Sequence, residues 1–226
     1  MNRVDYFLQK VQFWIRSKPL LYRFTLGIRA LLAMGFIPTG LVKLLGYRFT
    51  ILSIDNEVGA FFEMLYQTGL YWQFLGFTQV LAGILILIPA FSAVGALLFF
   101  GIMINILFIT LSLDFASTHI ITFQMLLATI WLIIWDFHRF RGLIFSSDSI
   151  FEKSHPDDDQ PIPLPNPTLS NNYERLVYVT GTFSGLLFFG MMRGPILPTG
   201  FAFFLLAVCL ICFVAAAVFG LRNLRA

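Results

Sequence analysis

Charged residues are scarce in this sequence, and cysteine is nearly absent. Only 12% of the 226 residues are charged and 58% are hydrophobic, whereas a soluble domain carries about 25% charge. A formal net charge of only +3 and the lack of a basic run exclude a nucleic-acid partner. The two cysteines lie inside one apolar run, which excludes a disulfide framework. We therefore predict an all-α integral membrane protein whose partner is the lipid bilayer.

The motifs of common enzymes are also missing. The three histidines show no metal-ligand spacing, and the sequence has no phosphate-binding loop, nucleophile elbow or haem-attachment motif. We therefore predict no metal site, and the residues alone do not decide whether the protein is an enzyme. Cys209 and Cys212 lie near the middle of an apolar run without a nearby cation that would lower a thiol pKa. We interpret them as small hydrophobic side chains.

Six stretches are long and apolar enough to cross a bilayer as helices. They are 26–45, 71–89, 93–113, 119–135, 176–192 and 199–221. Before them, residues 4–15 have apolar positions at helical spacing, and Pro19 follows. This pattern predicts an amphipathic helix in the membrane interface. A second short amphipathic helix is predicted around residues 58–65, and Ser92 is predicted to cap the third span.

Composition divides the chain into four parts. Residues 1–23 hold the interface helix, 24–140 a core of four spans, 141–175 a Pro-rich linker and 176–226 a hairpin of two spans. Few contacts are expected to cross such a linker, so we predict that the hairpin is peripheral to the core.

The positive charges are distributed unevenly between the two sides of the membrane. With the N-terminus inside, the cytoplasmic segments hold eleven Lys and Arg residues and the outer segments hold two. Because short cytoplasmic segments are enriched in Lys and Arg, we predict that both termini and the linker are cytoplasmic. The membrane is predicted to be the bacterial cytoplasmic (inner) membrane.

The first span carries two cations, Arg29 and Lys43. Fourteen residues separate them, so on a helix they point the same way and lie about 21 Å apart. A cation that faces lipid costs roughly 2.5–3.5 kcal/mol on insertion scales, so such residues normally face a bundle interior or a wet cavity. The alternative is that both cations snorkel to opposite interfaces and only anchor the helix.

Two aspartates lie at matching depths. Asp136 follows the fourth span at the depth of Arg29, and Asp114 follows the third span at the depth of Lys43. An ionised carboxylate at a membrane boundary needs water or a cation. We therefore predict the ion pairs Arg29–Asp136 and Lys43–Asp114, with surface solvation of both carboxylates as the alternative.

Other polar residues lie inside the spans, and each can either bond a neighbouring helix or line a polar pocket. Gln79 lies between Gly76 and Gly83, whose small size is expected to let another backbone approach. Thr122 and Thr129 repeat with Asp136 every seven residues. The predicted ligand-binding pocket comprises Arg29, Lys43, Gln79, Asn105, Asp114, Thr122, Thr129 and Asp136.

The motifs Arg29, Gly40-x-x-Lys43-Leu44 and Gln79-x-x-x-Gly83, followed by two closely spaced spans, resemble the DoxX and DoxX-like membrane proteins. The resemblance covers residues 24–140 and implies a compact four-helix transmembrane bundle. It also implies association with quinol-oxidase, thiosulfate–quinone or thiol-redox systems. The sequence departs from the family at Gln79, where the residue is often acidic, and this weakens any role for that position in carrying a proton.

Three functions are consistent with these features. The first is a redox-associated subunit that binds a lipophilic quinone-like molecule or supports a partner oxidoreductase. The second is a transporter or channel for a small solute, in which the intramembrane cations are substrate ligands. The third is a structural or assembly subunit of a larger membrane complex. The residues themselves identify no cofactor.

Overall fold

The computed structural model describes residues 3–113, 118–144, 164–165, 169, 172–192 and 199–222. These residues form helices and contain no strand. The helices are α1 (Arg3–Arg16), α2 (Pro19–Leu44), α3 (Glu57–Gln67), α4 (Leu70–Leu87), α5 (Ser92–Ser112), α6 (Thr118–Trp135), α7 (Phe137–Ile144), α8 (Asn172–Met192) and α9 (Thr199–Arg222). The predicted all-α class is confirmed. Asp114 and most of the Pro-rich linker lie outside the described residues.

Five helices in the described part of the chain are long and apolar enough to cross a bilayer. They are α2, α4, α5, α6 and the Phe201–Phe219 part of α9. Helix α8 is not among them, and its first two turns contain Glu174 and Arg175. The protein is therefore an integral membrane protein with at least these five candidate spans.

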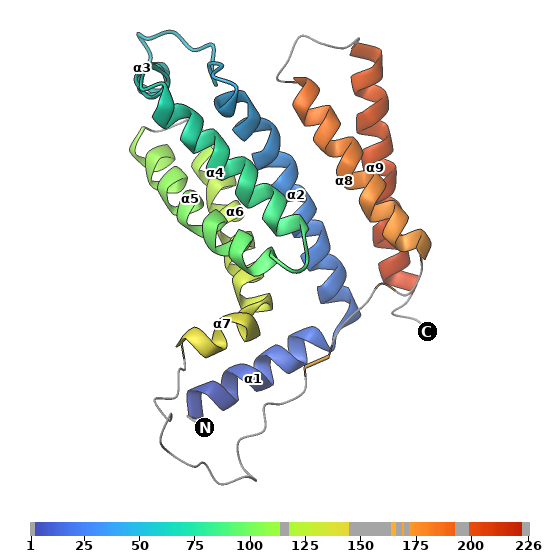
Figure 1. The fold of residues 1–226 in the computed structure, drawn as a ribbon. Helices are drawn as coiled ribbons and strands as arrows, with labels where there is room; N and C mark the ends of the chain where they lie inside the picture. Colours follow the sequence, from blue (N-terminus) through green and yellow to red (C-terminus); the bar gives the residue numbers. More distant parts are fainter. Residues whose placement is uncertain are drawn as a thin grey trace.

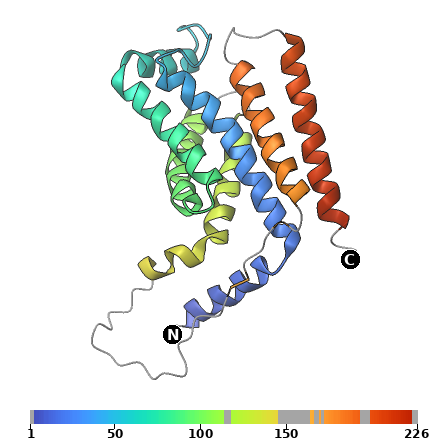
Figure 2. The same cartoon turned by 45° about the vertical axis from the view of Figure 1, so that its right-hand side comes forward.

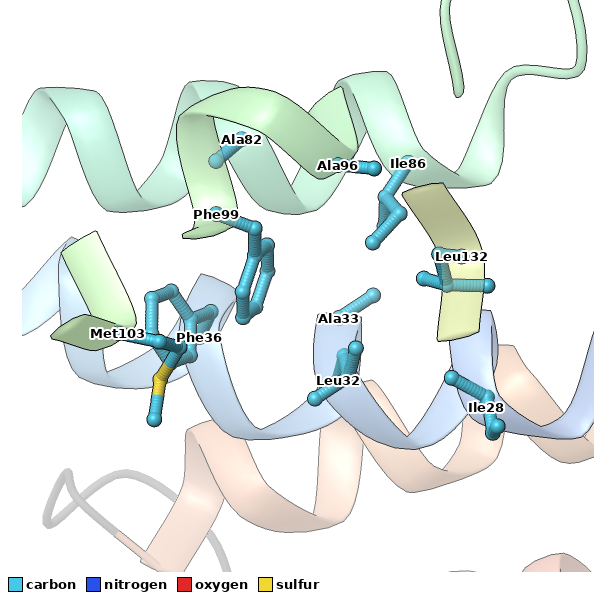
Figure 3. Close-up of a cluster of buried hydrophobic side chains, with 10 residues drawn as sticks. All are labelled: Ile28, Leu32, Ala33, Phe36, Ala82, Ile86, Ala96, Phe99, Met103 and Leu132. Atoms are coloured by element: carbon cyan, nitrogen blue, oxygen red, sulfur yellow. The ribbon is translucent and has the colours of Figure 1, made fainter. Parts of the chain in front are cut away.

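Helix α2 lies at the centre of the arrangement. It packs against α4 and α6 on one side and against the α8–α9 hairpin on the other (Figures 1 and 2). Apolar side chains of α2, α4, α5 and α6 meet in one buried cluster, in which the rings of Phe36 and Phe99 lie 3.9 Å apart (Figure 3). The cluster also contains Ala33. The stripe of α2 between Arg29 and Lys43 is thus filled by packed core.

Glycines bring the backbones of α2 and α4 close together. A Cβ added at Gly40 would lie 2.9 Å from the Gly76 carbonyl oxygen, and one at Gly76 would lie 2.8 Å from the Lys43 carbonyl carbon. A Cβ at Gly83 would lie 2.6 Å from Ile37. Small residues favour such close packing of membrane helices. The expectation that a glycine beside Gln79 admits another backbone is confirmed for Gly76, whereas Gly83 admits the Ile37 side chain.

Replacing Gly76 by alanine is expected to destabilise the protein by about 1–3 kcal/mol, because the new methyl group would force α2 and α4 apart. Gly101 offers a matched control in the neighbouring helix, because a Cβ there meets nothing within 4 Å. Gly101→Ala should be neutral or stabilising by up to about 1 kcal/mol, since alanine is the better helix former. Thermal melting in detergent measures both variants, and equal effects would contradict the close packing.

The two ends of the bundle differ. Helices α1 and α7 lie together at one end, and α3 lies at the opposite end (Figure 1); we call these the α1 end and the α3 end. Helix α1 stops before Pro19, as predicted, but α2 starts at this proline and not at residue 26. Proline suits the first position of a helix because its missing N–H would be unpaired there. Helix α3 is confirmed, and the Asn56 side chain accepts hydrogen bonds from the Val58 and Gly59 amides.

Helix α1 buries polar residues against the protein and exposes aromatic ones. Gln9 and Gln12 are only 5% and 3% exposed, whereas Phe7 and Trp14 are 64% and 60% exposed. Gln12 reaches the Trp135 carbonyl oxygen at 3.2 Å. This pattern is the reverse of a helix on a soluble protein and is typical of a helix whose apolar side chains enter a membrane interface.

The α8–α9 hairpin contacts the core through α2. A Cβ at Gly185 would overlap the Met34 side chain of α2, and Cys209 of α9 packs with Ala30 and Met34. Cys209 and Cys212 are free thiols. The hairpin is thus packed along the first span, with Gly185 at the close contact to α2.

Candidate functional site

A buried ion pair forms the centre of the site at the α1 end. Arg29 Nη2 of α2 lies 2.9 Å from Asp136 Oδ2, which follows α6. The side chains of Arg29 and Asp136 are 9% and 3% exposed. The same nitrogen donates to Ser92 Oγ at 3.1 Å, and the Ser92 hydroxyl donates to Asp136 Oδ2 at 2.7 Å. The predicted pair Arg29–Asp136 is confirmed, and the snorkelling alternative is excluded for Arg29.

Ser92 was missed as a member of this site. It is the first residue of α5, where Phe91 occupies the N-cap position without a side-chain bond to the helix. The prediction that Ser92 caps the third span is therefore wrong. Ser92 lies one position past the N-cap, and its hydroxyl is 2.7 Å from the buried Asp136 carboxylate and 3.2 Å from the Pro89 carbonyl oxygen.

Three residues of α1 and α7 surround this centre. Arg139 lies with Nε 3.9 Å from Asp136 Oδ1 and donates from Nη1 to the Ala90 carbonyl oxygen at 2.8 Å. Arg16 lies over the Trp135 ring, 5.5 Å from its centroid. His138 Nδ1 lies 3.1 Å from Gln12 Nε2 and 3.3 Å from Arg16 Nη1. Both neighbours are donors, so His138 Nδ1 accepts and the imidazole is neutral.

The pKa of His138 lies below its ordinary value of 6.5. Burial is the largest cause, and repulsion from the Arg16 guanidinium adds to it, whereas attraction by Asp136 opposes it. The unfolded chain therefore binds a proton at His138 before the folded chain does as pH falls. This contribution to stability is present above about pH 6.5 and is lost as pH falls towards the folded pKa.

We expect acidification below pH 6.5 to destabilise the protein by at most about 1.4 kcal/mol per pH unit through His138. His138→Asn keeps an acceptor near Gln12 and Arg16 but cannot titrate, so its melting temperature should vary less with pH. His119→Asn, in α6 at the α3 end, is the control and should keep the wild-type pH profile. Identical profiles for wild type and His138→Asn would contradict this role.

A second buried cation lies at the α3 end. Lys43 Nζ donates to Gln79 Oε1 at 2.8 Å, and the two residues are 8% and 5% exposed. The ammonium also lies 4.8 Å from the centroid of the Phe49 ring and 5.6 Å from that of Trp72. Aromatic faces stabilise a desolvated cation. Lys43 and Gln79, both predicted, are thus brought together, and Phe49 and Trp72 were missed because their spacing along the chain carries no signal.

A cavity of about 330 Å³ shares one residue, Phe49, with this second cation site. Its wall is built from the chain after α2 and from α3, and it includes Arg48, Phe49, Ile54 and Phe62. The rings of Phe49 and Phe62 lie 5.0 Å apart, so Phe49 faces both the cavity and the Lys43 ammonium. At the cavity edge, Arg48 and Glu63 form an exposed ion pair at 2.8 Å.

The other predicted pocket residues are scattered. Thr122 bonds to Thr110 of α5, with 3.0 Å between the two buried hydroxyls. Thr129 is fully buried, but its hydroxyl donates to Met125 of its own helix. Asn105 is exposed and donates to the Gly101 carbonyl oxygen one turn earlier. Asn105 therefore lies outside the bundle, because the rotation of α5 turns its apolar residues inward.

Asp114 lies outside the described residues, so the pair Lys43–Asp114 stays a prediction. The structure thus brings Arg29 to Asp136 and Lys43 to Gln79 at opposite ends of α2, with Thr122, Thr129 and Asn105 apart from both pairs, and does not gather the predicted residues into one pocket. Packed core separates the two pairs.

A further buried ion pair was missed by the sequence reasoning. Arg23 Nη2 of α2 donates to Glu174 Oε2 of α8 at 3.2 Å, and the Arg23 Nε bonds to the other oxygen. The two side chains are 7% and 1% exposed. Pairing opposite charges at equal depth could have found this pair, because Glu174 lies near the start of the fifth span and Arg23 lies near the start of the first.

Comparison with known proteins gives one informative match. No protein-family model and no solved structure matches the chain. Over 122 residues the chain is 30% identical to the uncharacterised protein YwoB of Bacillus subtilis (strain 168), and the match covers 51% of this chain and 78% of YwoB. The chain therefore belongs to the same protein family as YwoB.

Proposed function

We propose that this protein is a redox-associated membrane subunit with a DoxX-like core that binds a lipophilic quinone-like molecule at its α3 end and supports a partner oxidoreductase. One observation carries the proposal. A cavity with aromatic, aliphatic and polar side chains in its wall includes Phe49, and the ring of Phe49 also faces the buried Lys43 ammonium, which Gln79 binds. Ligand sites of this kind combine apolar walls with a few polar groups, in volumes from about 300 Å³ upward.

The cavity walls fit the chemistry of a quinone. The rings of Phe49 and Phe62 offer faces on which a quinone ring can stack. Arg48 provides N–H donors for a quinone carbonyl, which can only accept hydrogen bonds. Ile51 and Ile54 are strongly exposed at the rim, where they would contact an isoprenoid tail. When bound, a quinone would supply two-electron redox chemistry, and these residues would hold and orient it.

Quinone content tests the proposal directly. The protein is purified from membranes in a mild detergent, and quinones in an organic extract are quantified by mass spectrometry. Thr50→Trp should fill the cavity and lower the quinone content to the detergent background, because Thr50 lines the cavity. Phe108→Trp places the same ring on the exposed face of α5 and should keep wild-type content. Background quinone in the wild type, or equal content in both variants, would contradict the proposal.

We further infer that the chain crosses the membrane six times, with the α1 end in the cytoplasm of a bacterium. Helix α8 is 21 residues long and packs along α9 and α2, both of which are apolar enough to span. The excess of Lys and Arg in the segments at the α1 end supports the orientation, and the Bacillus relative supports the bacterial membrane.

Cysteine labelling tests the orientation. In a background that lacks Cys209 and Cys212, cysteines at Asn56 and Ser147 should react with an impermeant reagent from opposite sides of the membrane. Reaction from the same side would contradict the six-span arrangement.

The transport alternative receives less support from the described residues. A path along α2 between the two cations would have to pass the Phe36–Phe99 contact, and both of these rings are buried in the core.

A further inference from the structure

Positive charge exceeds negative charge at the α1 end. Three guanidinium groups, those of Arg16, Arg29 and Arg139, approach the single carboxylate of Asp136. Arg29 makes the close contact at 2.9 Å, whereas Arg139 stands 3.9 Å away. Among the described residues of this cluster, Asp136 is the only acid, and His138 is neutral. The cluster therefore carries two positive charges that Asp136 does not balance.

The remaining acceptors of the cluster are neutral. Arg139 bonds to the Ala90 carbonyl oxygen, and Arg16 bonds to the Pro165 carbonyl oxygen at 3.2 Å. In the described residues Arg29 Nε is buried without a hydrogen-bond partner. Burial lowers the pKa of Arg16, attraction by Asp136 opposes this shift, and repulsion from Arg139 and Arg29 adds to it. Neutral carbonyl groups satisfy donors but do not cancel charge, so an added anion would be stabilised here.

The position of α1 places this charge at a membrane surface. Phe7 and Trp14 project from α1 on the side away from its buried glutamines. Aromatic side chains of an interface helix lie at the boundary between head groups and acyl chains. Arg139 remains accessible, with 35% of its side chain exposed. Arg16 is half-buried on the same helix as the two aromatic residues.

We propose that the α1 end binds the head group of an anionic phospholipid, with Arg16 and Arg139 as the residues that contact its phosphate. Basic pockets beside membrane helices bind such head groups, and a guanidinium fork matches a phosphate better than an ammonium does. Arg29 holds Asp136 and sets the geometry of the cluster without contacting the lipid. The acyl chains lie beside the exposed aromatic side chains of α1.

Lipid addition to delipidated protein tests this site. Protein in dodecylmaltoside receives phosphatidylglycerol, phosphatidylcholine with the same acyl chains, or inorganic phosphate, and both melting temperature and lipid adducts in native mass spectrometry are recorded. Phosphatidylglycerol should raise the melting temperature and form adducts, and the other two should do so much less. A phosphatidylcholine response of equal size would overturn the proposal, and so would an equal response to inorganic phosphate, which would indicate a free-anion site.

Matched arginine variants locate the site. Arg16→Gln and Arg139→Gln should each weaken phosphatidylglycerol binding about fivefold, the factor typical of one basic residue at an anionic surface. Arg175→Gln removes an exposed arginine of α8 outside the cluster and should leave binding unchanged. Wild-type affinity in the double variant of Arg16 and Arg139 would overturn the assignment.

The wild-type protein provides an independent measurement in case a variant fails to fold. Sodium chloride should weaken phosphatidylglycerol adducts of the wild type, since salt screens charges at a surface. Adduct levels that do not change with salt would also overturn the proposal.

Discussion

Replacing Asp136 by alanine is expected to destabilise the bundle by about 3–5 kcal/mol, because a buried guanidinium would lose its counter-charge. Arg29 would keep a single polar neighbour, Ser92, at 3.1 Å. Arg29→Ala should also be costly, since the Asp136 carboxylate is buried and would lose its contact at 2.9 Å, while Arg139 stands 3.9 Å away. Thermal melting in detergent, with helical content followed by circular dichroism, gives the loss in each variant.

The double variant decides between pairing and independent anchoring. Arg29→Ala with Asp136→Ala should cost less than the sum of the two single changes, and less than either alone, because neither of these two buried charges is left without the other. The exposed pair Arg48 and Glu63, joined at 2.8 Å, is the control, and the same cycle there should show little coupling. Strict additivity for Arg29 and Asp136 would mean that the pair does not stabilise the bundle.

Replacing Glu174 by alanine is expected to be as costly, about 3–5 kcal/mol, because Arg23 would remain buried between α2 and α8 without its carboxylate. Among the described residues, the Arg23 side chain would then keep a bond from Nη1 to the Pro19 carbonyl oxygen at 3.3 Å. Arg175→Ala changes the adjacent, exposed position of α8 and should have little effect. Similar melting temperatures for Glu174→Ala and Arg175→Ala would contradict a stabilising role for the Arg23–Glu174 pair.

The Arg23–Glu174 pair also affects the expected stability of a chain truncated after residue 147. The four-span core is still predicted to insert without the hairpin, but removal of α8 leaves Arg23 and Met34 of α2 uncovered. We therefore expect the truncated chain to melt at a lower temperature than the full chain. Arg23→Leu should raise the melting temperature of the truncated chain part of the way back, because exposing a leucine to lipid costs much less free energy than exposing an arginine. No rescue would mean that apolar contacts, and not the charge, hold the hairpin.

Depth along the membrane axis was predictable, because each helical residue advances by a constant rise of about 1.5 Å. Counting residues from the ends of the spans therefore placed Arg29 level with Asp136, and the ion pair followed from opposite charge. The same count could have matched Arg23 with Glu174, had the hairpin not been treated as peripheral. Close packing of α2 and α4 was also predictable from the sequence, because Gly76 and Gly83 have no side chain that would keep another helix away.

The rotation of each helix was not predictable in the same way. Spans that are apolar on every side have no polar stripe opposite an apolar one, so no local pattern tells which face turns inward. Asn105 therefore could not be recognised as an exposed residue, and Ser92 could not be recognised as a partner of Asp136. Likewise, the burial of Gln12 under α1 depends on the Trp135 carbonyl oxygen, which belongs to a helix far away in the chain.

The sequence by itself determined the membrane class, the helical segments and the depth of each buried charge, because composition and a constant rise per residue act locally. Only the tertiary structure decided which groups meet at each depth. It divided the predicted pocket into a cluster around Asp136 and a cluster around Lys43, and it filled the space between them with apolar core. The physical reason is that helix rotation and neighbour choice depend on packing across the whole bundle, which no single segment encodes.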